Sequence, residues 1–149
     1  MAKRNSLKTS PCPVARSMDV IGDCWSMLII RNAMLGARRF GEFQKSLGLA
    51  KNILSARLKA LVVDGILSLT PASDGSAYQD YVLTEKGRAV LPIMVALRQW
   101  GETYAFRPGE PTTIMVDSKS GKPIKKLELR AADGTLLRYG DTRLEPSTA

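Results

Sequence analysis

The chain has 149 residues, 44% of them hydrophobic and 24% charged, with a formal net charge of +8, which is typical of one globular domain with its own core. Histidine is absent and only Cys12 and Cys24 supply thiols, so the Ser-His-Asp and Cys-His groupings of hydrolases cannot be assembled, and we expect no enzyme, no cofactor and no metal site. No apolar run reaches the roughly 18 residues of a membrane span, so we expect a cytoplasmic protein that binds no membrane.

Proline, glycine and apolar spacing predict the first two helices. Pro13 suits the first position of a helix over residues 13–21, and Gly22 ends this helix. Asp23 is a candidate N-cap for a second helix over residues 24–36, in which few positions are polar. A helix with so little polar surface is expected at the centre of the domain.

Two further helices are separated by a short turn that contains glycine. Residues 37–48 carry one apolar stripe, and a helix ending at residue 64 places Leu54, Leu58 and Leu61 on one face. This pair forms a helix-turn-helix pattern. The opposite face of the second helix carries small and polar groups, which either read the major groove of DNA or form an ordinary solvated surface.

A hairpin and a long apolar helix follow. Residues 66–84 alternate between apolar and polar positions around a polar tip at residues 73–78, which predicts the wing of a winged helix-turn-helix. Thr84 is a candidate N-cap for a helix over residues 85–105, and Pro92 should kink or break this helix. The helix is too apolar for a chain of this size to cover alone, so we expect a homodimer.

The predicted fold class is α+β, mainly α: a winged helix-turn-helix domain with a small C-terminal β extension. We expect residues 1–10 to be a flexible basic N-terminus, residues 11–106 to be the winged domain with its dimerisation helices, and residues 107–149 to be a β-strand extension. The extension could serve as a ligand cover, an interaction surface or a stabilising flap.

The excess positive charge lies entirely in the first part of the chain. Residues 1–59 hold eleven Lys or Arg and three acidic residues, whereas residues 60–149 hold eleven of each. A surface that neutralises DNA phosphates has this pattern, although a merely basic and soluble surface has it too. The leading hypothesis is a transcriptional regulator that binds double-stranded DNA as a homodimer on an inverted repeat and responds to a small-molecule effector or an oxidant. The alternative is a winged-helix module that binds another protein.

Several linked motifs occur in order between residues 11 and 105: CPV, IGDxW, RRFGEF, LSxRLKxL, DGI and YxLTEKG. In these motifs the chain resembles the HxlR family of bacterial transcriptional regulators, which are MarR-like winged-helix dimers. The resemblance implies a dimer formed by the first and last helices, with the recognition helix in the major groove and the wing beside it. Two positions depart from the family pattern, because Cys24 replaces a basic residue and Ala50 replaces a Ser or Thr N-cap.

Five residues of the predicted recognition helix are candidates for the DNA interface. Asn52 and Ser55 are placed to read base edges, while Lys51 and Lys59 suit contacts with phosphates. Arg57 lies beside the apolar stripe, so it either contacts a phosphate or pairs inside the domain.

Four further candidates lie outside this helix. Arg38 and Arg39 precede the third helix and suit a clamp on the DNA backbone, with solvated surface as the alternative. Ser73 and Ser76 belong to the wing tip, which could reach a minor groove or the backbone. The tip carries an acidic residue and no Lys or Arg, which is unusual for that role.

Cys12 resembles the cysteine that several family members use to sense oxidants or electrophiles. It directly precedes a helix N-terminus, with Arg16 one turn further on, and this position favours the thiolate. The alternative is a small residue packed at the dimer interface. A disulfide with Cys24 would require Cα atoms within about 7 Å.

Overall fold

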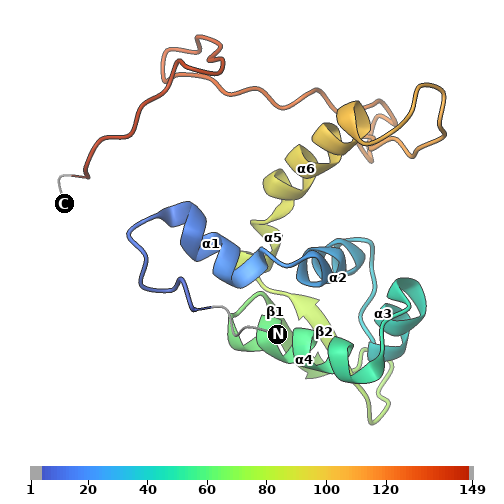
Figure 1. Ribbon diagram of the computed structural model, residues 1–149. Helices are drawn as coiled ribbons and strands as arrows, with labels where there is room; N and C mark the ends of the chain where they lie inside the picture. The colour runs from blue at the N-terminus through green and yellow to red at the C-terminus, as the bar shows by residue number, and fades with distance from the viewer. Residues whose placement is uncertain (1–4, 148–149) are drawn as a thin grey trace. The chain divides into compact units, whose positions relative to one another are not determined.

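Residues 5–147 are described by a computed structural model, which divides into two compact units, Met1–Met94 and Val95–Ala149 (Figure 1). The first unit contains five helices, a two-stranded sheet and the start of a sixth helix. The fold is mainly helical α+β, as predicted. No helix within residues 5–147 is both long and apolar enough to cross a membrane.

The first two helices follow the sequence prediction closely. Helix α1 spans Pro13–Ile21, and α2 spans Cys24–Met34. The Asp23 carboxylate accepts a hydrogen bond from the Ser26 N–H at 2.9 Å and so caps α2, as expected. Helix α2 ends at Met34, just before Gly36, the predicted end of this helix, where a φ of +103° is incompatible with a continuing helix.

Part of the predicted flexible N-terminus is attached to the domain. Residues 1–4 lie outside the described residues. The Ser6 hydroxyl and the Leu7 N–H each donate to the Asp19 carboxylate at 3.0 Å. Lys8 pairs with Asp64 at 3.3 Å. Residues 6–8 therefore contact both α1 and the segment after the fourth helix.

The helix-turn-helix consists of α3, Phe40–Leu47, and α4, Lys51–Val63. Helix α3 begins later than residue 37, because the Glu42 carboxylate accepts hydrogen bonds from the Arg38 and Arg39 N–H groups at 2.7 and 3.0 Å and fixes the N-terminus there. Gly48 ends α3 in the left-handed conformation with φ 64°, which glycine adopts without strain.

The wing is an antiparallel hairpin of β1, Leu67–Pro71, and β2, Gln79–Leu83. In Figure 1 the hairpin lies beside α3 and α4. The Tyr81 N–H donates to the Arg38 carbonyl oxygen at 2.7 Å, and the Tyr81 ring meets Phe43 edge-on at 6.3 Å. These two contacts hold the wing against α3 and the segment that precedes it.

The predicted long helix is divided in two near Pro92. Helix α5 spans Glu85–Arg88 and is capped by Thr84, whose hydroxyl accepts from the Gly87 N–H at 3.1 Å. Helix α6 spans Leu91–Tyr104. A proline ring clashes with the carbonyl four residues earlier, which here belongs to Arg88, so one continuous helix cannot form across this point.

The core of the first unit lies between α2, α3, α4 and the hairpin. The side chains that form it are fully or nearly fully buried and are mostly branched aliphatic. They are Ile21, Ile29, Ile30, Phe43, Leu49, Leu54, Leu58, Leu61, Ile66, Leu67 and Val90. This core fixes which face of α4 remains outside.

The extension contains less β structure than predicted. Its turns form, but the flanking residues pair only at two isolated antiparallel bridges, Val116 with Pro123 and Arg130 with Leu136. A two-stranded ribbon without a third strand or a packed face is marginal in water, and here no ladder develops. Gln99 of α6 accepts from the Leu127 N–H at 2.8 Å, so the extension is attached to α6 within the second unit.

Candidate nucleic-acid interface

Helix α4 presents a polar face opposite its buried leucines. Lys51, Asn52, Ser55 and Lys59 are all exposed, whereas Leu54, Leu58 and Leu61 are buried in the core. The four polar side chains form no hydrogen bond or ion pair with other side chains in residues 5–147. Their donors are therefore available to an external partner, as a recognition helix requires.

The start of α4 lacks a side-chain cap, in contrast to α2 and α5. Ala50 is the N-cap residue and has no side-chain oxygen to accept a hydrogen bond from the first turn. The N–H groups of a first turn carry partial positive charge that favours anions. The basic end of α4 is thus electropositive through its backbone as well as through Lys51.

Arg57 forms an ion pair inside the domain, which is one of the two roles that the sequence left open. Its Nη1 lies 3.6 Å from the Asp23 Oδ2, so the residue links α4 to the N-cap of α2. Both side chains are partly exposed, and an ion pair of this kind contributes at most about 1 kcal/mol to stability.

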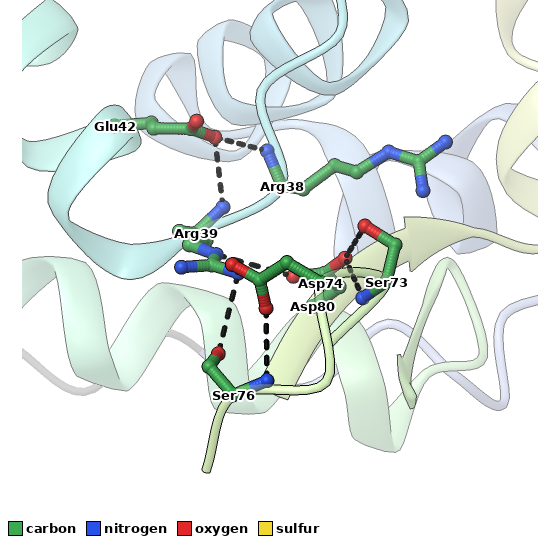
Figure 2. Close-up of polar contacts among 7 residues, drawn as sticks. All are labelled: Arg38, Arg39, Glu42, Ser73, Asp74, Ser76 and Asp80. Atoms are coloured by element: carbon green, nitrogen blue, oxygen red, sulfur yellow. Dashed lines mark hydrogen bonds and ion pairs between the residues drawn. The ribbon is translucent and has the colours of Figure 1, made fainter. Parts of the chain in front are cut away.

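Arg38 and Arg39 are neighbours in sequence but point in different directions. In Figure 2 the Arg38 side chain extends away from the carboxylates, and within residues 5–147 its guanidinium forms no ion pair or hydrogen bond. The backbone of Arg38 is held at both its N–H and its carbonyl. The N–H groups of Arg38 and Arg39 lower the pKa of Glu42, which accepts from both.

The guanidinium of Arg39 reaches into the wing. Its Nη2 donates to the Asp74 Oδ2 at 2.6 Å, and its Nε lies 3.5 Å from the Oδ1 of buried Asp80 (Figure 2). The Tyr78 ring lies against it, with 5.6 Å between the Arg39 Cζ and the ring centroid. Arg39 therefore connects the N-terminus of α3 to the wing tip.

Both wing serines turn toward these carboxylates. The Ser73 N–H and hydroxyl lie 3.4 Å from the Asp80 Oδ2, and the Ser76 N–H donates to the Asp74 Oδ1 at 3.0 Å. The hydrogen bonds from Ser76 and then from Arg39 lower the pKa of Asp74 to about 2. The two serines thus organise the wing tip, whatever else they contact.

Sequence reasoning missed Asp80 and treated Asp74 only as an unexpected charge. Aspartate is depleted in strands, so an aspartate within the alternating segment of β2 was the available signal for a buried partner. The sequence does not reveal which basic residue would serve, because Arg39 lies 41 positions earlier and approaches only through the fold.

A helix-turn-helix with an unpaired basic helix face, placed beside a β-hairpin wing, defines a winged-helix DNA-binding protein. Residues 20–108 match the family described as HxlR-like helix-turn-helix. The chain belongs to this family.

The relatives are consistent with that assignment. An uncharacterised HTH-type transcriptional regulator of Mycobacterium tuberculosis, Rv3095, is 40% identical over 98 residues, which cover 66% of this chain and 62% of the relative. The aligned residues therefore span less than two thirds of that relative's length.

Two solved structures are similar to this chain over different lengths. The crystal structure of PA1607, a candidate transcription factor, is 55% identical, with a TM-score of 0.91 over 96% of this chain and all of that chain. The redox regulator HypR in its oxidised form is 32% identical, with a TM-score of 0.56 over 62% of this chain and 96% of that chain. The extension therefore has a counterpart in PA1607.

Proposed function

We propose that the chain is a transcriptional regulator that binds an inverted repeat in double-stranded DNA as a homodimer and performs no catalysis. The observation that carries the proposal is the exposed face of α4, on which Lys51, Asn52, Ser55 and Lys59 have no partner among the described side chains. Asn52 and Ser55 read base edges in the major groove, and Lys51 and Lys59 contact phosphates.

Arg38, in the segment that precedes α3, provides a further contact with the DNA backbone. Its guanidinium is exposed and unpaired within residues 5–147, while its backbone is fixed by Glu42 and Tyr81. A charged group on a fixed backbone positions a protein on the duplex without reading its sequence. Arg57 pairs with Asp23 inside the domain, so we propose no contact between Arg57 and a DNA phosphate.

Footprinting of protein-bound genomic DNA tests the function. We expect protected sites that contain two half-sites related by a dyad, with centres about one helical turn or 10 base pairs apart. Protection spread evenly over the genome, with no recurring repeat, would contradict sequence-specific regulation. The genes beside the protected sites would identify the regulated pathway.

A second copy of the chain covers the apolar faces of the dimerisation helices. In the first unit, α1 exposes Val14 and Met18. In the second unit, α6 exposes Leu97, Trp100 and Tyr104, and the rings of Trp100 and Tyr104 contact each other at 5.5 Å. Exposed aromatic clusters of this kind are typical of the centres of protein interfaces.

The dimer predicts a large effect at Trp100, whose side chain is 63% exposed. Trp100→Glu places a charge in the interface, and we expect the dimer dissociation constant to rise at least about thirtyfold, the effect of losing a central aromatic contact. Sedimentation equilibrium measures the constant. Leu35→Glu, at an exposed leucine after α2, is the matched control and should leave it unchanged. Equal constants for wild type and Trp100→Glu would contradict this interface.

Cys12 is proposed as the oxidant-responsive residue. Both Cys12 and Cys24 are exposed free thiols, and the neighbour HypR is described as a redox regulator. We expect Cys12→Ser to retain DNA binding but lose any release of DNA by diamide, as followed by gel shift. Cys24→Ser should keep the response. A Cys12→Ser protein that still responds would place the effector site elsewhere in the dimer.

A further inference from the structure

The Asp74 carboxylate accepts hydrogen bonds from donors that can bind any oxyanion. Arg39 Nη2 donates to one of its oxygens at 2.6 Å, and the Ser76 N–H donates to the other at 3.0 Å. The Ser76 hydroxyl lies 3.4 Å from the same Arg39 nitrogen (Figure 2). Phosphodiester oxygens accept the same charge-assisted hydrogen bonds as a carboxylate does.

The two ends of the Arg39 guanidinium face different surroundings. Its Nε lies beside Asp80, whose side chain is only 3% exposed, and a buried carboxylate without a charged partner is strongly unfavourable. Its Nη2 contacts Asp74, whose side chain is 55% exposed and can return to water at little cost. Arg39 therefore keeps the contact between its Nε and Asp80, whereas its Nη2 can exchange Asp74 for another anion.

Arg39 supplies the positive charge that the wing itself lacks. Residues 72–80 contain no Lys or Arg, yet the Arg39 guanidinium lies at their tip. Arg39 also lines an open groove of about 820 Å³ together with Gly41 and Tyr78. An external phosphate can therefore approach the guanidinium without displacing the strands.

We propose that Arg39 binds a DNA phosphate at the wing and that Asp74 occupies this site in the DNA-free protein as an internal competitor. The proposal rests on the DNA-binding function proposed above. On binding, Arg39 keeps Asp80 and exchanges Asp74 for the phosphate. Protons do not drive the exchange near neutral pH, because hydrogen bonds from Ser76 and Arg39 hold the pKa of Asp74 at about 2.

The test begins with Asp74→Asn, which removes the charge but keeps an oxygen that accepts from the Ser76 N–H. In the wild type the displaced Asp74 carboxylate stays near the phosphate and offsets the charge of Arg39, so little net counterion release results. In the variant one additional counterion is released, so DNA should bind about fivefold more tightly at 0.15 M salt. The slope of log affinity against log salt should steepen by about 0.9.

A second background shows whether Arg39 mediates the gain. In Arg39→Gln combined with Asp80→Asn, both charges of the buried pair are absent, so neither carboxylate nor guanidinium is left buried and unpaired. We expect Asp74→Asn to give no fivefold gain in this background. A gain of the same size there would overturn the proposal, because direct repulsion between Asp74 and DNA would then explain it.

Asp133→Asn is the matched charge control. Asp133 accepts from the Thr135 N–H at 2.9 Å in a similar turn of the extension but has no arginine partner among residues 5–147, and the variant should leave affinity unchanged. Weaker binding by Asp74→Asn, with an unchanged salt slope, would overturn the competitor role and make Asp74 a residue that positions the wing. A wild-type protein that binds no duplex at low salt would instead overturn the proposed function, and the phosphate role of Arg39 with it.

Discussion

Replacing Lys51 and Lys59 together by glutamate is expected to weaken binding to duplex DNA by about 10²–10³-fold at 0.15 M salt. Two phosphate contacts are lost and two like charges are added, and each counterion equivalent changes affinity about fivefold at this salt concentration. The salt dependence should weaken as well, with the slope of log affinity against log salt reduced by at least about 1.8. Fluorescence anisotropy at several salt concentrations measures both quantities.

Lys125→Glu with Lys126→Glu is the matched control, because these exposed lysines of the extension give the same change in net charge. Affinity should stay within about threefold of wild type, since these lysines belong to neither α4 nor the wing and salt screens charges that make no direct contact with the duplex. An equal loss of DNA affinity in both double variants would mean that net charge, and not the face of α4, governs binding. Unchanged affinity in both double variants would favour the alternative of a module that binds another protein.

Phe43→Ala is expected to lower the free energy of unfolding by about 3–5 kcal/mol. Phe43 is 0% exposed, packs in the core and meets Tyr81 edge-on, so the substitution leaves a cavity between α3 and the wing strand β2. A loss of this size is a large fraction of the stability of an ordinary small domain. Urea denaturation followed by circular dichroism, at one fixed protein concentration because the chain is a proposed dimer, measures it.

Phe106→Ala provides the comparison at an exposed phenylalanine, which is 41% exposed. Its cost should stay below about 1 kcal/mol, because little buried surface is lost. If both variants unfolded at the same urea concentration, the core would not depend on α3 packing against the wing.

Local chemistry made most of the winged domain predictable. Asp23 and Thr84 cap their helices as expected, because an N-cap acts through hydrogen bonds to residues two or three positions away. The break near Pro92 follows from a clash within one turn. The polar face of α4 could also be predicted, since the buried leucines determine which side of the helix remains outside.

The partners of Arg39 could not be predicted in the same way. Asp74 and Asp80 lie 35 and 41 residues further along the chain, and they meet Arg39 because the fold places the wing beside Arg38, whose carbonyl accepts from the Tyr81 N–H. Sequence patterns report periodicity and caps but not which distant charges a tertiary contact brings together. Arg39 was therefore expected to clamp DNA directly, without the wing contacts that it makes.

The structure of the extension was less predictable than that of the winged domain. Turns form at residues 117–122 and 131–135, where glycine and aspartate favour them, but strand formation depends on neighbouring strands and a packed face that the sequence pattern does not guarantee. The similarity to PA1607 over 96% of this chain shows that the extension recurs in another protein.

The measurement that tests the central claim most directly is a competition between two duplexes for the wild-type protein at 0.15 M salt. One duplex carries the inverted repeat recovered by footprinting, and the other carries the same bases in scrambled order. A sequence-specific regulator should prefer the repeat by at least about 10³-fold. Equal affinity for the two duplexes would contradict the proposal that α4 reads DNA sequence.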